Sequence, residues 1–394
     1  MVGRSDRPII GFDATSALTQ GGGIGRYTRE LIRALVAEAP GLHFKLFTAR
    51  SPASSPVPDS LPTASNVTRH RAPLDERWLY RMWYRGRIPI PVQTITGRLD
   101  LFHSPDFVLP FVSGHVPTLL TVHDLSFIRY PETFPARLTA YLNRTVPWSV
   151  ARATHILADS VSTRNDLKYL WNVPDEKVTV LYSGVNERFR RVPDEVQSAV
   201  RARYDLGETP VILSLGTVQP RKNYEFLVRA FEPVSRQAPH SLIIVGAKGW
   251  LDEGLSAEIE RLQLAGRVRI TGFVADEDLP ALYSAADLFV FPSLYEGFGL
   301  PILEAMACGV PVITSNSSSL PEVITRDDGE LAAIMLSPYD EAAWTMEMLR
   351  LLADEDTRHS LSEAGIAQSA RFRWQKAAAE LATLYRRLLE KQKN

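Results

Sequence analysis

Cysteine is almost absent from this chain of 394 residues, in which Cys308 is the only one. A single cysteine excludes a disulfide within the chain and any metal site built from several cysteines. The chain also has no excess of charge of either sign, because its 44 lysines and arginines are balanced by 45 aspartates and glutamates. With a formal net charge of −1, no general basic field favours nucleic acid as a partner.

Long hydrophobic runs are missing too. No stretch approaches the roughly 20 apolar residues that a membrane-spanning helix needs, and residues 1–7 contain no apolar signal region. We therefore expect a cytoplasmic protein, with peripheral attachment to the inner face of the membrane as an open alternative. Hydrophobic residues make up 45% of the chain and charged residues 23%, which is typical of a globular protein.

Short apolar runs alternate with helical patterns along the whole chain, which predicts α/β domains whose parallel sheets are covered by helices on both faces. The expected strands of the first half are residues 8–12, 43–47, 99–103, 118–122, 155–158 and 177–181. The second half repeats the rhythm with residues 211–215, 241–245, 268–271, 287–290 and 310–314. Residues 51–66, which are rich in proline and serine, are expected to form a loop.

The polar segment 186–208 separates the two halves and predicts the boundary between two doubly wound domains. A helix is expected over residues 375–391. Its residues Leu381, Leu384, Tyr385 and Leu388 form one apolar stripe, which a helix of a globular protein must bury.

Two glutamates, Glu296 and Glu304, are the most informative pair in the sequence. Glu296 lies in a glycine-broken loop that follows the strand pattern at 286–292, where open α/β sheets bind ligands. Glu304 lies inside a helix whose first turn is marked by Pro301 and whose N-terminus favours an anion. An anion site beside two carboxylates suits a phosphorylated sugar. The alternative is that both acids are solvated and only complement the helix dipole.

Arg221 and Lys222 stand between the strand 211–215 and a helix that is expected to start at Asn223, a good N-cap residue. Two cations beside the positive end of a helix repel one another unless an anion is bound. Since arginine and lysine both bind phosphate, this corner predicts a diphosphate site. The alternative is a solvated basic loop.

The Glu-x7-Glu segment resembles the signature of retaining glycosyltransferases of the GT-B fold, family 4, and other segments extend the resemblance over nearly the whole chain. These are the glycine loop at 20–26, the Val-His-Asp run at 122–124, the Arg-Lys pair and the Gly-Phe-Val run at 272–274. The resemblance implies two Rossmann-like domains facing each other across a cleft. Residues 1–188 would bind the acceptor, residues 189–372 the nucleotide sugar donor, and the helix 373–394 would pack back on the first domain.

The resemblance also implies roles for single residues. Glu304 would bind the ribose, Glu296 the transferred sugar, and Arg221 and Lys222 the leaving diphosphate. The implied catalytic residues are Glu296, His123, Arg221 and Lys222. The implied donor-binding residues are Gly22, Gly23, Gly216, Arg221, Lys222, Phe273, Val274, Glu296, Phe298, Gly299, Leu300 and Glu304.

Several of these positions have plainer alternatives. His123, at the carboxyl end of a strand and next to Asp124, could form only a structural hydrogen-bonded pair, and His103 is a similar but weaker candidate. Phe273 and Val274 could simply pack. The glycine loop at 20–26 lacks the last glycine of a dinucleotide fingerprint and could be only a strained turn.

The expected reaction is retaining transfer of a hexose from a nucleoside diphosphate sugar to a hydroxyl of a glycan or lipid-linked acceptor. The resemblance to this family implies mannose as the sugar and GDP or UDP as the nucleotide. No second carboxylate is placed as a nucleophile, so attack on the same face is expected. The alternatives are an epimerase or phosphorylase on the same fold and a non-catalytic nucleotide-sugar-binding protein.

We expect no metal ion and no cofactor beyond the donor. The two Asp-x-Asp strings, at 276–278 and 354–356, precede helical stretches, where acids act as caps. The segment 77–87 combines four arginines with four aromatic residues. It could lie on an anionic membrane or contact a lipid-linked acceptor. Alternatively, its aromatic residues enter the core of the first domain.

Overall fold

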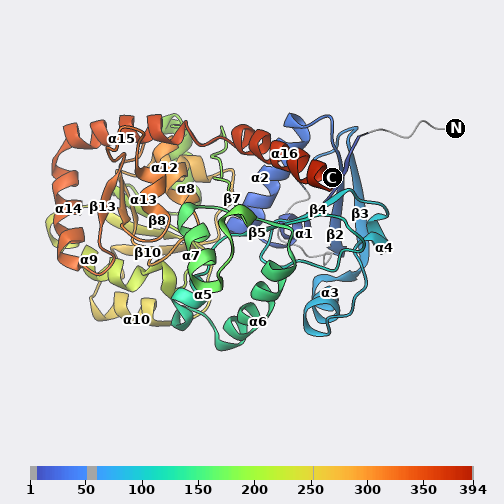
Figure 1. The fold of residues 1–394 in the computed structure, drawn as a ribbon. Coiled ribbons are helices and arrows are strands. Elements are labelled where there is room, and N and C mark those ends of the chain that lie inside the picture. The colour runs from blue at the N-terminus through green and yellow to red at the C-terminus, as the bar shows by residue number, and fades with distance from the viewer. Residues whose placement is uncertain (1–6, 51–59, 252, 393–394) are drawn as a thin grey trace. The chain divides into compact units, whose positions relative to one another are not determined.

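The computed structural model describes residues 7–50, 60–251 and 253–392 (Figure 1). The start of the chain at residues 1–6 and most of the loop expected at 51–66 lie outside the described residues. The chain divides into two compact units. Unit 1 comprises Met1–Leu125, Ala140–Gly184 and Arg373–Asn394, and unit 2 comprises Ser126–Thr139 and Val185–Phe372. Each unit is built on one parallel sheet.

The sheet of unit 1 has seven strands in the order β3-β2-β1-β4-β5-β6-β7. The strands are β1 Ile9–Asp13, β2 His43–Arg50, β3 Val67–Asp75, β4 Leu101–Ser104, β5 Thr118–Val122, β6 His155–Ala158 and β7 Val178–Val180. Strands β4, β5 and β6 are buried along their whole length, as unbroken apolar runs predict for a sheet covered on both faces. The strand order reverses between β1 and β4, where Phe12 lies opposite His103.

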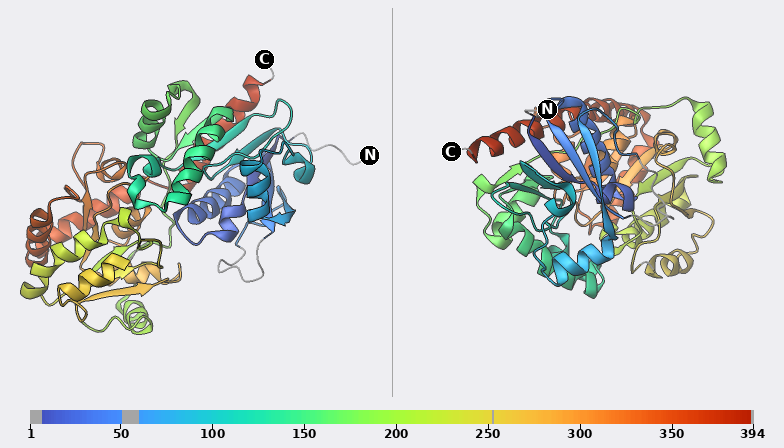
Figure 2. Two further views of the ribbon diagram at one scale, coloured as in Figure 1. Left: turned by 90° about the horizontal axis from the view of Figure 1, so that it is seen from below. Right: turned by 90° about the vertical axis from the view of Figure 1, so that its right-hand side faces the viewer.

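The helices wholly within unit 1 are α1 Thr15–Thr19, α2 Gly23–Glu38, α3 Glu76–Tyr80, the π-helix η1 Arg81–Arg85, α4 Gln93–Thr96, α7 Val161–Trp171, η3 Asp175–Lys177 and α16 Trp374–Lys391. Helix α6, Ala136–Arg152, contains the boundary between the units. Both ribbon views show the red α16 beside the blue amino-terminal elements (Figures 1 and 2), and α16 packs on α2. Its apolar stripe is buried there.

His103 belongs to this packing. Its Nδ1 lies 2.7 Å from the hydroxyl of Tyr385 in α16, and its Nε2 lies 3.0 Å from Oγ1 of Thr121. Burial lowers the pKa of His103 to about 3, so the ring is neutral. The structure therefore makes His103 a core residue that joins α16 to the sheet, and it removes this histidine from the candidate site.

The sheet of unit 2 has six strands in the order β10-β9-β8-β11-β12-β13. The strands are β8 Val211–Leu215, β9 Ser241–Val245, β10 Val268–Gly272, β11 Leu288–Phe291, β12 Val312–Ser315 and β13 Ile334–Leu336. Its helices are α5 Ser126–Arg129, η2 Pro131–Thr133, α8 Asp194–Arg203, η4 Pro220–Lys222, α9 Tyr224–Gln237, α10 Glu253–Arg261, α11 Leu279–Ser284, α12 Leu300–Ala307, α13 Leu320–Ile324, α14 Glu341–Ala353 and α15 Glu355–Ser369.

Unit 2 has a separate core on each face of its sheet. Ile212 packs with α9, α10 and α14, whereas the next residue, Leu213, packs with α8, α11, α12 and α13. This alternation follows from the period of two in a strand, in which successive side chains point to opposite faces. The doubly wound arrangement expected from the sequence is therefore present in both units.

Two edge strands and one segment differ from expectation. Strands β3 and β13 were not predicted, because each is an edge strand without a buried apolar run. Residues 126–139 were expected within the first domain, but their contacts group them with unit 2. There, Nε1 of Trp250 donates a hydrogen bond of 2.8 Å to the carbonyl of Thr133, and Phe134 packs against the Trp250 ring.

Candidate active site

In unit 2, the predicted ligand-binding side chains lie in the loops that follow β8 and β11, the two strands between which the strand order reverses. Open α/β sheets bind ligands at the carboxyl ends of their strands at such a switch point. The loop after β8 begins with Gly216 and ends with Arg221 and Lys222, and the loop after β11 contains Glu296. Gly216 has a φ of 155°, and a Cβ there would lie 3.0 Å from Cε of Lys222. The glycine therefore allows the lysine side chain to pass close to the backbone.

Arg221, Lys222 and Glu296 form one buried ion cluster. Nζ of Lys222 lies 2.6 Å from Oε1 of Glu296, and Nη1 of Arg221 lies 3.1 Å from Oε2. The three side chains are between 9% and 12% exposed. Burial raises the pKa of Glu296, but the charges of Arg221 and Lys222 outweigh it and lower the pKa to about 2. The cluster thus holds two positive charges and one negative charge.

This cluster corrects one step of the sequence argument. Arg221 and Lys222 were expected to repel one another in the absence of a ligand, but Glu296 supplies an anion from within the chain. The pairing could not be found by pattern, because 74 residues separate Lys222 from Glu296. Only the adjacency of β8 and β11 brings the two loops together.

Asn223 occupies the N-cap position of helix α9, as expected, but its side chain does not cap the helix. Asn223 stands just before the helix in a left-handed conformation, with a φ of 61°, and makes no side-chain cap. Its Nδ2 instead donates hydrogen bonds to the carbonyls of Pro338, at 2.9 Å, and Pro292, at 3.3 Å. Asn223 therefore ties the cationic loop to the end of β11 and to the segment after β13.

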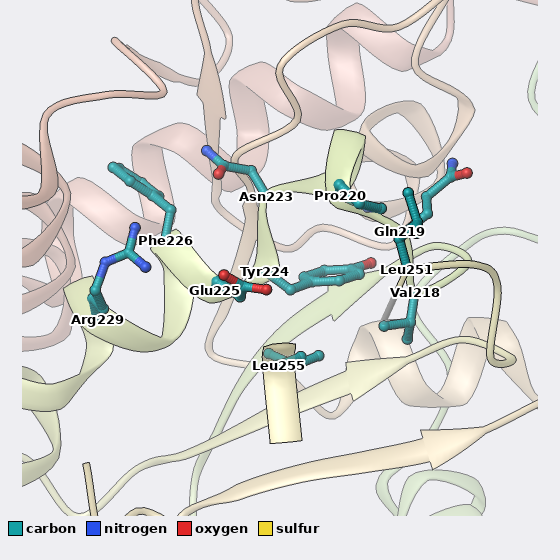
Figure 3. A pocket seen from close by; sticks show the side chains of 10 residues that line it. All are labelled: Val218, Gln219, Pro220, Asn223, Tyr224, Glu225, Phe226, Arg229, Leu251 and Leu255. Atoms are coloured by element: carbon teal, nitrogen blue, oxygen red, sulfur yellow. The ribbon is translucent and has the colours of Figure 1, made fainter. Parts of the chain in front are cut away.

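Further hydrogen bonds fix both loops. The hydroxyl of Tyr224 donates to the carbonyl of Gly216 at 3.1 Å. The Tyr224 ring also lines a small cavity of about 130 Å³, together with Pro220 and Leu255 (Figure 3). On the other loop, the N–H of Glu296 donates to Oγ of Ser318 at 2.7 Å. These contacts hold the carboxylate and the two cations on separately anchored turns.

Glu304 lies in α12 and is only 2% exposed. Its Oε2 accepts a hydrogen bond of 3.0 Å from the hydroxyl of Tyr283, a partner that the sequence did not indicate. Gly299, immediately before α12, has a φ of 118°, a conformation that favours glycine. A Cβ there would also lie 2.9 Å from Cδ2 of Leu320, so this corner has no room for a side chain.

The remaining donor-site candidates of unit 2 divide by exposure. Phe298 is buried against Phe372, with ring centroids 5.8 Å apart. Val274 is buried in the core, whereas Phe273 is 65% exposed. Leu300 opens α12 and is half-buried. Only the ring of Phe273 is therefore available to stack on a ligand.

His123, in unit 1, is a buried cation. Its Nδ1 lies 2.7 Å from Oδ2 of Asp159, and its Nε2 lies 2.9 Å from the carbonyl of Pro105. Burial opposes the charged form, but the charge and hydrogen bond of Asp159 outweigh it and raise the pKa of His123 to about 9. Both ring nitrogens then donate to protein acceptors. The acidic partner is Asp159, which directly follows the neighbouring strand β6, and not the adjacent Asp124.

The glycine loop of unit 1 opens helix α2. Gly22 and Gly23 are exposed, and a Cβ at either would meet nothing within 4 Å. At Gly25, a Cβ would lie 1.9 Å from the carbonyl oxygen of Gln20. The glycine that packing requires is therefore Gly25, whereas Gly22 and Gly23 only leave open space around the start of the helix.

In the part of the chain that the structure describes, no group of three His, Cys, Asp or Glu residues is arranged to hold a metal ion. Of the Asp-x-Asp residues, Asp354 caps α15 as expected, accepting a hydrogen bond of 3.0 Å from the N–H of Thr357. Asp278 precedes α11 but makes no side-chain cap. It forms an ion pair of 2.6 Å with Arg203, which lies in α8 of the same unit.

Solved structures share this architecture across the whole chain. A sucrose-phosphate synthase from Thermosynechococcus elongatus superposes with a TM-score of 0.75 at 22% identity, covering 98% of this chain and 100% of the other. HepE from Anabaena, solved with UDP and glucose, superposes with a TM-score of 0.71 at 19% identity, covering 96% and 99%. Two Rossmann-like units with parallel sheets, shared with these structures over the whole chain, define the GT-B fold.

Sequence comparison defines the family. Residues 21–189 match the model of Glycosyltransferase Family 4, and residues 197–368 match that of Glycosyl transferases group 1. O-antigen chain mannosyltransferase B from Escherichia coli is 34% identical over 381 residues, which cover 93% of this chain and 96% of that protein. The serotype-specific mannosyltransferase WbdA from Escherichia coli is 33% identical over 300 residues, which cover 73% of this chain and 36% of that longer protein. The chain belongs to glycosyltransferase family 4.

Proposed function

We propose that this glycosyltransferase moves mannose, with retention of configuration, from a nucleoside diphosphate sugar to a hydroxyl of a glycan or lipid-linked acceptor. The buried cluster of Arg221, Lys222 and Glu296 carries the proposal, because it provides an excess of positive charge at a ligand-binding switch point. Mannose as the sugar is supported by the names of two relatives, an O-antigen chain mannosyltransferase and a serotype-specific mannosyltransferase. The nucleotide is GDP or UDP.

In this proposal the two cations stabilise the leaving diphosphate. An ammonium group carries three N–H donors and a guanidinium five, so the pair can hold phosphate oxygens together with Glu296. Their positions are fixed before the reaction, so little reorganisation is needed as negative charge develops on the diphosphate. Neutralisation by Arg221 and Lys222 would make a divalent metal unnecessary. A phosphate oxygen would take the proton of the acceptor hydroxyl, which attacks on the face that the diphosphate leaves.

Other residues of unit 2 bind the rest of the donor. Glu304 accepts hydrogen bonds from the ribose hydroxyls, and its bond from Tyr283 sets the orientation of the carboxylate. The exposed ring of Phe273 stacks on the base. Glu296 contacts the transferred sugar while it stays paired with the cations. The backbone of Phe298, Gly299 and Leu300, together with Gly216, faces the sugar and the phosphates.

Unit 1 contributes acceptor binding and the glycines Gly22 and Gly23, whose open surroundings leave room for a ligand. His123 uses both ring nitrogens inside the protein, so we assign it a positioning role. The imidazolium holds the segment at Pro105, which follows β4, close to the ends of β5 and β6. Its positive charge also acts on Asp106 in the same segment.

The test is a transfer assay with GDP-mannose and UDP sugars, coupled to detection of the released nucleoside diphosphate. We expect Lys222→Ala and Arg221→Ala to lower kcat at least a hundredfold, and Glu304→Ala to raise mainly the donor KM. Arg236→Ala removes an exposed arginine of α9 and serves as the matched control. Activity should persist in excess EDTA. Full activity of all three site variants, or absence of nucleoside diphosphate release by the wild type, contradicts the proposal.

The proposal includes peripheral contact with a membrane through α3, η1 and the residues that follow. The structure divides the aromatic residues of this segment, because Trp83 and Tyr84 are buried whereas Trp78 is 54% exposed. Ile88 and Ile90 are also exposed, as are all four arginines of the segment. Exposed arginines beside exposed apolar side chains match an anionic lipid surface. No helix in the described parts of the chain is long and apolar enough to span a membrane.

Vesicle flotation tests this contact. The triple variant Arg81→Ser, Arg85→Ser, Arg87→Ser should lose most of its binding to vesicles that contain phosphatidylglycerol, because each arginine near the surface contributes about 1 kcal/mol. The double variant Arg33→Ser, Arg98→Ser changes exposed arginines elsewhere in unit 1 and should retain binding. Equal binding by the triple variant and the wild type refutes the contact.

A further inference from the structure

Residues 126–139 are a part of unit 2 that comes from the first half of the chain. They follow β5 and His123 and lead into α6, yet their contacts group them with unit 2. Two hydrogen bonds make the segment compact. The N–H of Tyr130 donates to the carbonyl of Ser126 at 2.7 Å, and Oγ1 of Thr133 donates to the carbonyl of Tyr130 at 2.7 Å. These bonds link the short helices α5 and η2.

The amino-terminal part of this segment contacts the loop that holds Arg221. The ring of Tyr130 packs on the ring of Tyr295, with centroids 6.0 Å apart and an interplanar angle of 55°. Tyr295 is 6% exposed, and its carbonyl accepts a hydrogen bond from Nη1 of Arg221. Oε2 of the next residue, Glu296, lies 3.1 Å from the same guanidinium nitrogen. The loop after β11 therefore fixes the direction of the guanidinium, and Tyr130 packs against this loop.

Tyr130 also reaches the segment after β13. Its hydroxyl lies 3.3 Å from the hydroxyl of Tyr339. Burial and then this hydrogen bond raise the pKa of Tyr130 to about 12, so the hydroxyl stays protonated at neutral pH. Tyr339 follows Pro338, whose carbonyl accepts the hydrogen bond of 2.9 Å from Nδ2 of Asn223. Because Asn223 directly follows the cationic loop, residues 216–222, Tyr130 contacts two separate supports of this loop.

The carboxyl-terminal part of the segment is held by Trp250, which lies after β9. Nε1 of Trp250 donates to the carbonyl of Thr133 at 2.8 Å, and the ring of Phe134 packs on the indole with centroids 5.8 Å apart. The preceding residue, Gly249, donates its N–H to the carbonyl of Val218 at 3.0 Å, and a Cβ at Gly249 would lie 2.4 Å from that oxygen. Since Val218 belongs to the cationic loop, the segment contacts supports of this loop after β9, β11 and β13.

We infer that Tyr130 and Trp250 are positioning residues of the transfer reaction, through which residues 126–139 hold the guanidinium of Arg221 in place against the leaving diphosphate. The inference rests on the proposed function and deepens it, because it names residues outside the ion cluster on which stabilisation of the diphosphate depends. Preorganised donors stabilise developing charge while their direction is fixed. A displacement of about 1 Å lowers a rate by as much as about a hundredfold. The ion pair with Glu296 limits the displacement when either positioning residue is truncated, so we expect a smaller loss.

Transfer kinetics and a double-mutant cycle test the inference. Tyr130→Ala and Trp250→Ala should each lower kcat about tenfold and change the donor KM less than twofold, because the interaction lost acts in the transition state. Tyr130→Phe keeps the packed ring and should retain kcat within twofold of the wild type. In an Arg221→Ala background, Tyr130→Ala should lower kcat less than twofold further, since its effect passes through the missing guanidinium. Tyr169→Ala removes a tyrosine of α7 that is 80% exposed and should leave kcat unchanged.

Hydrogen exchange of the wild type gives a second readout, which does not depend on the folding of any variant. GDP or UDP, bound at the cationic loop, should slow amide exchange in residues 126–139 at least twofold, whereas residues 161–171 of α7 should not change.

Three outcomes overturn the inference while the proposed function stands. They are a wild-type kcat in Tyr130→Ala and Trp250→Ala, an undiminished effect of Tyr130→Ala in the Arg221→Ala background, and unchanged exchange of residues 126–139 with bound nucleotide. If Arg221→Ala, Lys222→Ala and Glu304→Ala all keep full activity, the proposed function fails and the inference fails with it.

Discussion

Replacing Glu296 by glutamine removes the only negative charge of the ion cluster while nearly keeping its shape. Folding lowers the pKa of this carboxyl from 4.5 to about 2. At about 1.36 kcal/mol for each pKa unit, the ionised carboxylate stabilises the folded state by roughly 3 kcal/mol at neutral pH. The variant also leaves two cations close together in a buried site. Breaking a buried ion pair by removal of one partner costs about 3–5 kcal/mol, which agrees in size.

The expected result is a Glu296→Gln protein whose melting temperature at pH 7 is lower by roughly 6–12 °C, taking 2–4 °C for each kcal/mol in a domain of this size. Because the folded pKa is depressed, the contribution is present above pH 4.5 and is lost as pH falls through about 2. The difference between variant and wild type should therefore shrink in acid. Differential scanning calorimetry from pH 3 to pH 8 measures it.

Adding a nucleoside diphosphate distinguishes the electrostatic effect of the Glu296→Gln substitution from its effect on packing. The anion should raise the melting temperature of Glu296→Gln more than that of the wild type, because it neutralises the uncompensated cations. Glu363→Gln changes an exposed glutamate of α15 and should alter neither value. A Glu296→Gln protein with the wild-type melting temperature at pH 7 would refute the energetic role assigned to the cluster.

Three further substitutions test the titrating and hydrogen-bonded groups of unit 1, each by urea unfolding. His123→Gln should lower the free energy of unfolding by about 3 kcal/mol at pH 7, because folding raises the pKa of His123 to about 9. This stabilisation by the charged ring is complete below pH 6.5 and is lost as the pH rises through 9. Asp13→Asn should stabilise the fold by up to about 3 kcal/mol at pH 8, since its raised pKa makes ionisation costly, and the gain should vanish below pH 3.8. Tyr385→Phe should cost about 1 kcal/mol at every pH above 4, because it removes the hydrogen bond to the neutral His103. Unchanged unfolding midpoints would contradict each expectation.

Much of the fold follows from local pattern. Strands such as Thr118–Val122 and Val211–Leu215 were predicted with their observed bounds, because a fully buried parallel strand is an unbroken apolar run between turns. Strand β3 was not predicted, because it lies at the edge of the sheet and most of its side chains face solvent, so its sequence has no buried apolar run. For the same reason β13, at the edge of the other sheet, carries no strong signal.

The residues of the candidate site could be proposed from the sequence, but the ion pairs between them could not. The loops that hold Arg221, Lys222 and Glu296 follow strands, which indicates the ligand edge of a sheet. That Glu296 neutralises the two cations depends on the order of strands, which the sequence does not state. His123 shows the same limit, because the sequence offered the adjacent Asp124 as its acid, whereas the partner is Asp159, which follows the neighbouring strand β6.

Helix α16 has a consequence for biosynthesis. Unit 1 needs residues 373–392 to cover α2 and to bond His103, yet these residues follow all of unit 2 in the chain. On the ribosome, residues 185–372 emerge as one continuous stretch and can fold before the first half is complete. The apolar surface of α2 that α16 covers stays exposed until translation is nearly finished, so we expect the amino-terminal half to be the more prone to aggregation during synthesis.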